Sequence, residues 1–323
     1  MRAIGIDPGT RTWDFVCLED GNLILDETVP TGKVKKEPGL VINLIKEFNP
    51  DLVNAPSGYG LPLKRIGDLN DGDFFQITLK KTFKKSFIKK KGANLGVTKV
   101  LGLMVENEIP AVVLPGVKHL PTVPVHRKIN KIDMGTPDKV CSAAAGISTF
   151  DDREDASFIL AEIGSAFNAF IAVECGKIVD GIGGTLASSG FRSSGGLDGE
   201  AAYLYDVEKE NLFKGGFSYI KDKKLALDYF IEGIVKDIYS SASCMDAKTV
   251  LLSKSKEVPE VRKELEKRIK MDIRELKGYA EASNAAQGAA IIVDGLGGGK
   301  YKALVDRMEI KNSSGSVFDY MLF

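Results

Sequence analysis

The sequence is poor in the residues that build structural zinc sites. It has four cysteines and two histidines in 323 residues, and no pair of cysteines has CxxC spacing. A zinc site from such scattered ligands is not expected. Reduced cysteines in the core of a cytosolic protein are expected instead. The cysteines and histidines of the sequence are Cys17, Cys141, Cys175, Cys244, His119 and His126.

Net charge and long apolar runs are also missing. Lysine plus arginine (44) equals aspartate plus glutamate (44), so no overall attraction to nucleic acid or to a membrane is expected. No apolar run approaches about 18 residues, which a membrane-spanning helix needs. The chain opens with a strand pattern rather than a signal peptide. We therefore expect a cytoplasmic protein without a membrane partner.

The most informative stretch that is present is IGIDPGT at residues 4–10. Its alternating pattern predicts a strand that ends at Asp7 in a tight turn, followed by strands at 13–18 and 22–26. One interpretation is ordinary turn chemistry. In the other, Asp7 holds a divalent metal while Gly9 and Thr10 face an anion. Actin-like phosphotransferases and ATPases use this device, and so do RNase H-like nucleases.

The chain reads as two similar α/β halves, each opening with a β-hairpin. The second hairpin is expected within residues 167–185, with its turn at 174–176. A lone nuclease needs only one half, so the repetition favours the actin-like class. We predict two RNase H-like lobes, each a mixed sheet flanked by helices, with a cleft between them. The predicted ranges are 1–140, with 303–323 returning to that lobe, and 141–302.

The expected elements of each half follow from periodicity and breaker residues. In the first half, helices are expected at 37–50 and 92–109 and strands at 51–57 and 110–116. In the second half, 154–165 is read as a helix or the entry to a strand, and a buried strand is expected at 249–253. Helices are expected at 222–240, 257–270 and 283–296.

Asp133 lies in a second Asp-x-Gly-Thr, within NKIDMGTPDK at residues 130–139. It is a candidate general base or second metal carboxylate. The alternative is a helix start, with Thr136 as the N-cap before Pro137. Both interpretations stay open.

The glycine-rich stretch at residues 161–200 predicts contact with phosphate through backbone amides. Arg192 within it is a candidate to neutralise a transferring phosphoryl group or to clamp a carboxylate. The alternative is a flexible loop with an exposed arginine. The predicted phosphate-binding residues are Gly164, Ser165, Gly183, Gly184 and Thr185.

Two further segments have a functional and a structural interpretation. DGLGGGKY at residues 294–301 lacks Walker A spacing, and its Gly297 and Gly298 either approach a nucleotide or end a helix. Residues 80–91 hold seven lysines with two phenylalanines. They could bind nucleic acid or an anionic substrate, but a solvated segment with anchored rings is favoured because charge elsewhere cancels. A nucleic-acid partner is therefore not expected.

With these segments in view, the chain resembles the superfamily of acetate and sugar kinases, Hsp70 and actin. IGIDPGT resembles its first phosphate motif, and residues 161–185 with Phe191–Gly195 resemble the second phosphate segment of acyl kinases. Residues 111–121 resemble the strand that carries an Arg-Gly-Gly or His-Gly-Gly in butyrate and acetate kinases. The whole chain resembles an archaeal family of predicted butyrate kinases.

The resemblance implies an ATP- and Mg²⁺-dependent kinase that phosphorylates a short-chain carboxylate such as butyrate. It implies Mg²⁺ on Asp7, phosphates on the glycine-rich segments, and Arg192 at the transferring phosphoryl group. A small-molecule substrate and a second copy of the chain are the expected partners.

The sequence departs from the acyl-kinase pattern in places. Leu114-Pro115 stands where butyrate kinases carry an arginine, Lys254-Ser255 where a Gly-Gly is expected, and Gly164-Ser165-Ala166 lacks a second glycine. An ATPase-type regulator or activator on the same scaffold therefore stays an alternative. The less favoured rival is an RNase H-like nuclease with Asp7, Asp133 and Asp138 sharing two metals.

Overall fold

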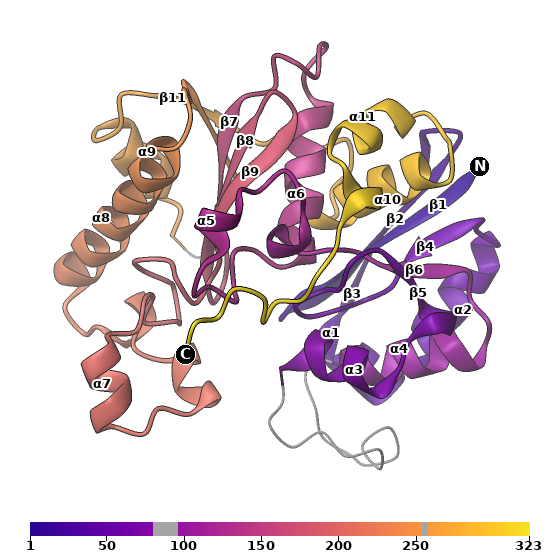
Figure 1. Cartoon of the computed structure of the whole chain (residues 1–323), viewed down its shortest axis with the longest axis horizontal. Coiled ribbons are helices and arrows are strands. Elements are labelled where there is room, and N and C mark those ends of the chain that lie inside the picture. Colours follow the sequence, from indigo (N-terminus) through magenta and orange to yellow (C-terminus); the bar gives the residue numbers. More distant parts are fainter. Residues whose placement is uncertain (80–95, 254–257) are drawn as a thin grey trace.

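The computed structural model describes residues 1–79, 96–253 and 258–323. The lysine-rich segment and Lys254-Ser255 thus lie outside the described residues. The described chain forms two mixed sheets flanked by helices (Figure 1), and each sheet with its covering helices is called a lobe below. No helix in the described ranges is long and apolar enough to cross a membrane.

The first sheet has the strand order β3-β2-β1-β4-β6-β5. Its first three strands are antiparallel neighbours, whereas β4 runs parallel to β1 and β6 parallel to β4. The strands are β1 Arg2–Pro8, β2 Thr12–Glu19, β3 Asn22–Pro30, β4 Leu52–Asn54, β5 Lys64–Arg65 and β6 Ala111–Val113. The helices beside this sheet are α1 Thr31–Lys36, α2 Gly39–Phe48, α3 Asp71–Thr78 and α4 Val97–Glu106. α5 Val125–Lys128 lies beside the second sheet instead, where the Arg127 guanidinium donates to the Val179 carbonyl (Figure 1).

The second sheet repeats this arrangement, with the order β9-β8-β7-β10-β11. Again three antiparallel strands are followed by parallel ones. The strands are β7 Phe158–Ile163, β8 Asn168–Glu174, β9 Lys177–Ile182, β10 Thr249–Leu252 and β11 Asp272–Glu275, and the helices are α7 Gly199–Leu204, α8 Lys223–Ala242 and α9 Val261–Glu266. The repeated topology confirms the prediction of two lobes built alike.

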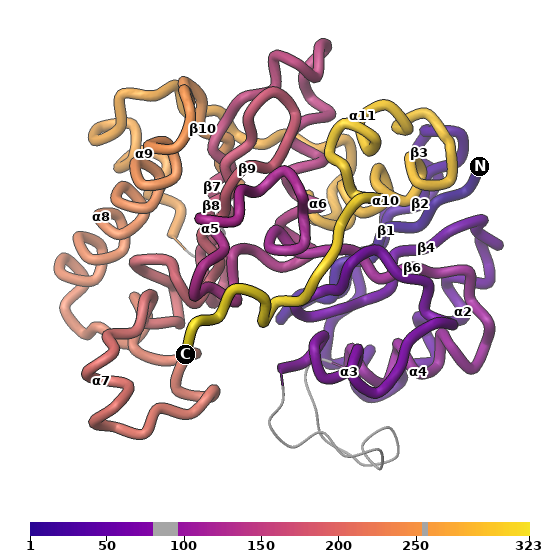
Figure 2. The backbone as a smooth tube through the Cα atoms, viewed as in Figure 1, coloured from indigo at the N-terminus to yellow at the C-terminus, as the bar shows by residue number. Residues whose placement is uncertain are grey.

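Two helices lie side by side between the sheets, α6 (Pro137–Ser148) and α10 (Asn284–Leu296) (Figure 2). α10 packs on β1 and β2, and α6 packs on β7 and β8. α10 closely approaches both α6 and β1 because the facing residues are small. A Cβ on Gly288 would lie 1.7 Å from the carbonyl oxygen of Cys141, and one on Gly5 of β1 would lie 2.1 Å from that of Ala286. One hydrophobic core therefore joins both lobes.

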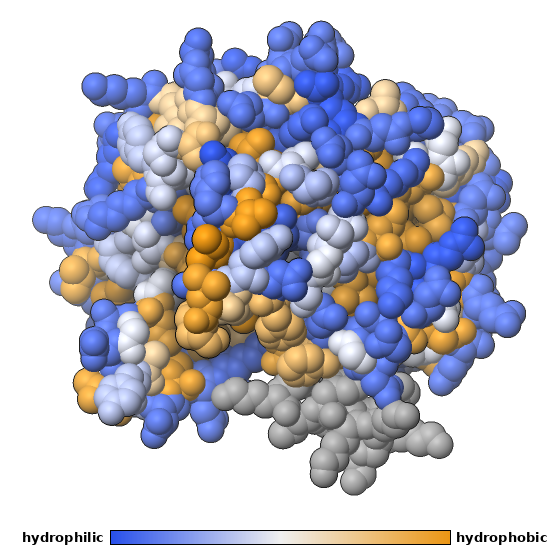
Figure 3. All heavy atoms as spheres, in the orientation of Figure 1, coloured by the Kyte–Doolittle hydropathy of each residue, from blue (hydrophilic) through white to orange (hydrophobic). Residues whose placement is uncertain are grey.

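The last helix, α11 (Lys302–Arg307), leads into a C-terminal segment that runs back across the molecule (Figure 1). The segment contacts the first lobe, since the Leu63 amide donates to Ser313 Oγ at 2.9 Å and Phe318 stacks on Phe75. The chain ends in exposed apolar side chains. Figure 3 shows apolar residues gathered on the face of the molecule that this segment crosses. The residue boundaries of the lobes, 1–140 with 303–323 and 141–302, stay a prediction.

Candidate functional site

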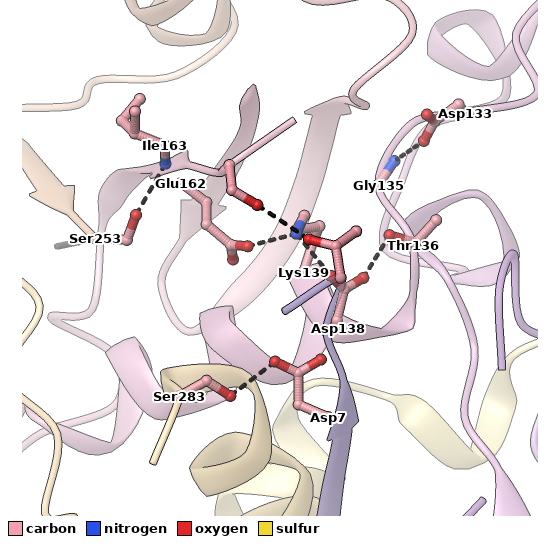
Figure 4. A network of polar contacts seen from close by, with 12 residues as sticks. Asp7, Asp133, Gly135, Thr136, Asp138, Lys139, Glu162, Ile163, Ser253 and Ser283 are labelled. Atoms are coloured by element: carbon pink, nitrogen blue, oxygen red, sulfur yellow. Dashed lines mark hydrogen bonds and ion pairs between the residues drawn. The ribbon is translucent and has the colours of Figure 1, made fainter. Parts of the chain in front are cut away.

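Asp7 lies near the end of β1, where the two sheets meet the start of α10 (Figure 4). Ser283, the N-cap of α10, accepts from the Ala286 amide and donates its hydroxyl to Asp7 Oδ2 at 2.7 Å. Burial and the charges of Asp138 and Asp14 raise the pKa of Asp7 to about 7, although the Ser283 hydrogen bond and Lys139 act in the opposite direction. Asp7 is thus a carboxylate whose charged form would be stabilised by a cation.

The turn between β1 and β2, residues 9–11, is called the first tip. The Gly9 amide donates to the Asp7 carbonyl at 3.0 Å, and a Cβ on Gly9 would lie 2.7 Å from the Thr12 carbonyl oxygen. Glycine is required there by this close approach. Thr10 is exposed at the tip, so its amide and hydroxyl can reach a ligand.

The turn between β7 and β8, residues 164–167, is called the second tip, and its glycine likewise closely approaches the carbonyl oxygen three residues on. The Gly164 amide donates to the Phe167 carbonyl at 3.1 Å, and a Cβ on Gly164 would lie 2.4 Å from that oxygen. The two tips meet, since Thr10 Oγ1 and Ser165 Oγ are 3.0 Å apart. The fold therefore brings together the predicted residues Gly9, Thr10, Gly164 and Ser165.

Glu162 corresponds to Asp7, because each lies two residues before the glycine of its tip and β7 occupies the place of β1 in its sheet. Glu162 is not among the residues predicted from the sequence. The signal that could have identified it is the repeat of Asp-x-Gly-Thr as Glu-x-Gly-Ser at 162–165.

Lys139, in the first turn of α6, joins two carboxylates beside Asp7 (Figure 4). Its ammonium donates to Asp138 Oδ2 at 2.6 Å and to Glu162 Oε1. Burial alone would lower the pKa of Lys139, but the charges of Asp138 and Glu162 hold that pKa above its ordinary value.

Asp138 has the complementary shift. Burial would raise its pKa, but Lys139 and the hydrogen bond from Thr136 Oγ1 outweigh burial and lower it. The Thr136 hydroxyl is therefore engaged with Asp138. The predicted helix start at Thr136-Pro137 is confirmed, but no side-chain hydrogen bond from Thr136 caps α6.

Asp133 lies in the loop before α6 and supports the turn after β9. Its Oδ1 accepts from the Gly135 amide, and its Oδ2 accepts from the amide and the hydroxyl of Thr185, all at 3.2 Å. A Cβ on Gly183 would lie 1.9 Å from Asp133 Oδ1, so the glycine admits this carboxylate. Burial raises the pKa of Asp133 against these hydrogen bonds. Both donors of Thr185 expected for phosphate are engaged with Asp133.

Gly184 and Arg192 both lie beside the second tip. A Cβ on Gly184 would lie 2.6 Å from the Phe167 Cβ. The amides of Arg192 and Ser193 donate to the Ala166 carbonyl at 3.1 and 3.0 Å, and the Arg192 side chain is exposed. The fold thus places the backbone of Arg192 at the second tip, with its side chain exposed to solvent.

Gly297 and Gly298 are not brought to this site. They follow the C-terminal end of α10, whereas Asp7 contacts its N-cap, and 13 helical residues span about 20 Å. A Cβ on Gly297 would lie 2.0 Å from the Met1 side chain, at the other end of β1. A surface pocket of about 380 Å³, lined by residues that include Lys277, Tyr279 and Lys300, contains none of the predicted site residues.

The carboxylates near the tips fit a site for Mg²⁺ bound with a nucleotide better than a two-metal nuclease site. In the described ranges no group of three or more His, Cys, Asp or Glu side chains could hold a metal by itself. Mg²⁺ bound with a nucleotide needs only one or two carboxylates, because phosphates and waters supply the other ligands. Asp7 beside the two tips fits that requirement. The two-metal arrangement of Asp7, Asp133 and Asp138 needed for a nuclease has no supporting observation.

Comparison with solved structures finds the same fold in other proteins. The chain matches the crystal structure of acetate kinase from Entamoeba histolytica with a TM-score of 0.57 and 14% identity, over 83% of this chain and 86% of that one. It matches a candidate N-acetylmannosamine kinase from Listeria monocytogenes with a TM-score of 0.51 and 12% identity, over 90% and 97%. At such low identity these matches establish the two-lobed fold.

Comparison by sequence gives the family. No curated protein matches the chain. A family model described as "Protein of unknown function (DUF1464)" matches residues 5–323. Because that match spans nearly the whole sequence, the chain belongs to the DUF1464 family.

Proposed function

We propose that this protein is an ATP-dependent phosphotransferase that binds Mg²⁺–ATP where the two tips meet. The observation that carries the proposal is the contact between the tips, each a glycine turn with a hydroxyl and a carboxylate two residues before the glycine. Such turns offer backbone amides and hydroxyls to phosphate from two sides. The kinase matches agree with this arrangement.

The residues near the tips have distinct roles in this proposal. Asp7 would hold Mg²⁺, which supplies charge neutralisation to the phosphate oxygens. Gly9, Thr10, Gly164 and Ser165 would bind the phosphates. Arg192 would stabilise charge on the transferring phosphoryl group, since positioning and electrostatics dominate this chemistry. Asp133 would position Gly183 and Thr185, from whose amides it accepts, rather than act as a base.

We propose a short-chain carboxylate such as butyrate as the phosphoryl acceptor. This choice follows the resemblance to acyl kinases. A carboxylate acceptor is already a nucleophile at neutral pH, so it needs no general base. That agrees with the engagement of both Asp133 oxygens in hydrogen bonds.

The second candidate is an ATPase that regulates a partner. The specific observation in its favour is at the end of β6, where Leu114 and Pro115 replace the expected arginine and are buried. These two side chains present no charge to an acceptor carboxylate.

ADP release from Mg²⁺–ATP, with and without C2–C6 carboxylates, distinguishes the two candidates. The phosphotransferase predicts that a carboxylate increases ADP release and that an acyl phosphate accumulates. The ATPase predicts slow release that no carboxylate changes.

Either activity should fall at least about 100-fold in Asp7→Ala. Asp306→Ala, which removes a surface carboxylate paired with Lys302, should leave it unchanged. Wild-type protein without Mg²⁺–ATP binding would refute both candidates.

A further inference from the structure

Lys139 is the one cationic side chain that the structure places among the carboxylates beside Asp7, counting the described residues. Three carboxylates, those of Asp7, Asp138 and Glu162, lie around it, and Figure 4 shows its ammonium between Asp138 and Glu162. The side chains of Lys139 and Glu162 are only 18% and 19% exposed. Removing such charges from water is costly unless they are paired.

Glu162 depends on this pairing more than Asp138 does. Asp138 also accepts from Thr136 Oγ1. Glu162 Oε1 accepts from Lys139, whereas Glu162 Oε2 is buried without a hydrogen-bond partner among the described residues. A half-satisfied buried carboxylate needs a nearby positive charge.

The ion pair also joins separate elements. Lys139 and Asp138 lie on α6, whereas Glu162 lies on β7, two residues before the glycine of the second tip. The adjacent Ile163 amide donates to Ser253 Oγ, which fixes the other side of this strand end. The Lys139 ammonium is therefore the contact that holds the second tip to α6 at Glu162.

We propose that Lys139 is a built-in monovalent cation of the site, which positions the second tip and makes a free monovalent ion unnecessary there. This inference rests on the proposed function for its catalytic consequence, but its structural consequence can be measured without nucleotide. Asp7 is then left as the carboxylate available to a divalent ion with a nucleotide.

The prediction concerns what replaces the ammonium once the side chain is shortened. Lys139→Ala leaves Asp138 and Glu162 unpaired around a space of ammonium size. The ammonium ion has the charge and N–H donors of the lost group, whereas tetramethylammonium has the charge but no donor. Ammonium chloride should therefore stabilise Lys139→Ala selectively.

The test is thermal unfolding in ammonium chloride and in tetramethylammonium chloride at equal ionic strength, without nucleotide. We expect ammonium to raise the Tm of Lys139→Ala saturably, by about 3 °C at ten times its dissociation constant, and to leave wild type unchanged. Lys177→Ala, which breaks a single ion pair with Glu309, is the matched control and should show no selectivity. Recovery of folded variant in ammonium chloride but not in tetramethylammonium chloride would also support the proposal.

Activity gives the second readout. Mg²⁺–ATP turnover should be lower in Lys139→Ala by a factor on the order of 100, and ammonium should raise the turnover of the variant at least tenfold. Equal Tm values, or equal loss of folded protein, in the two salts would overturn the proposal. A wild type without turnover, together with selective stabilisation of the variant, would refute the proposed function alone.

Discussion

Asp7 is the proposed Mg²⁺ ligand, and its pKa is shifted by burial and by neighbouring charges. Its pKa is raised from 3.8 to about 7, chiefly by burial and by Asp138. The native state therefore binds a proton more tightly than the unfolded chain does between these values. The free energy of unfolding falls with rising pH wherever the native state holds more protons than the unfolded chain. The contribution of Asp7 to that free energy therefore decreases as the pH rises from about 4 to 7.

The first prediction follows from that sign. Asp7→Asn keeps the neutral shape at every pH, so the free energy of unfolding of the variant relative to wild type should increase from pH 4 to pH 8. Urea denaturation at pH 4, 6 and 8 measures this difference. A difference independent of pH would contradict the raised pKa. Glu309→Gln, at a half-exposed ion pair, serves as the control carboxylate.

Asp133 shows what local sequence cannot reveal. Its Asp-x-Gly-Thr repeat predicted a base, a metal carboxylate or a helix start, and the structure adds a role none of these described. Its Oδ2 accepts from Thr185, 52 residues away. Likewise Glu162 and Lys139 meet only through the fold, because β7 and α6 converge there.

At the scale of elements, the sequence predicted what depends on local pattern. The helix expected at 283–296 is α10, Asn284–Leu296 with Ser283 as N-cap, because its apolar residues and its capping serine are adjacent in the chain. The strand expected at 249–253 is β10, Thr249–Leu252. Both opening hairpins were also found.

Elements without a strong pattern were missed or extended. The helix expected at 257–270 is α9, Val261–Glu266, and β11 was not predicted, because Ile273 is its only buried residue. No local pattern tells which end of α10 lies near Asp7. Gly297 and Gly298, predicted to approach a nucleotide or to end a helix, lie at the end of α10 that is distant from Asp7.

The second prediction concerns the contact between α6 and α10. Gly288→Ala places a Cβ 1.7 Å from the Cys141 carbonyl oxygen, so the helices must separate. We expect a loss of about 1–3 kcal/mol in the free energy of unfolding. Gly102→Ala in α4 meets nothing within 4 Å and should instead stabilise, by up to about 1 kcal/mol. Urea denaturation measures both, and equal effects would contradict the packing described.

At the scale of the whole molecule, polar contacts join the lobes besides the shared core. One is the contact of Thr10 with Ser165 at the tips. Another is made by Lys209, whose ammonium donates to the Thr78 carbonyl at 3.0 Å and lies 5.2 Å from the centre of the Tyr59 ring. A phosphate bound between the tips would have to change the first contact.

The third prediction uses that contact. Thr10→Cys/Ser165→Cys, in a Cys175→Ser background that removes the exposed native thiol, should form a disulfide under mild oxidation. Mg²⁺–ATP should slow its formation, because phosphate would occupy the space between the tips. Gel mobility measures the rate, with Thr10→Cys alone as control. An unchanged rate at saturating nucleotide would contradict the proposed position of the phosphates.

The most direct test of the central claim is a crystal structure with Mg²⁺ and a non-hydrolysable ATP analogue. We expect the terminal phosphates between Thr10 and Ser165, with the metal on the Asp7 side of the nucleotide. A nucleotide bound elsewhere, or a metal held without Asp7 nearby, would contradict it.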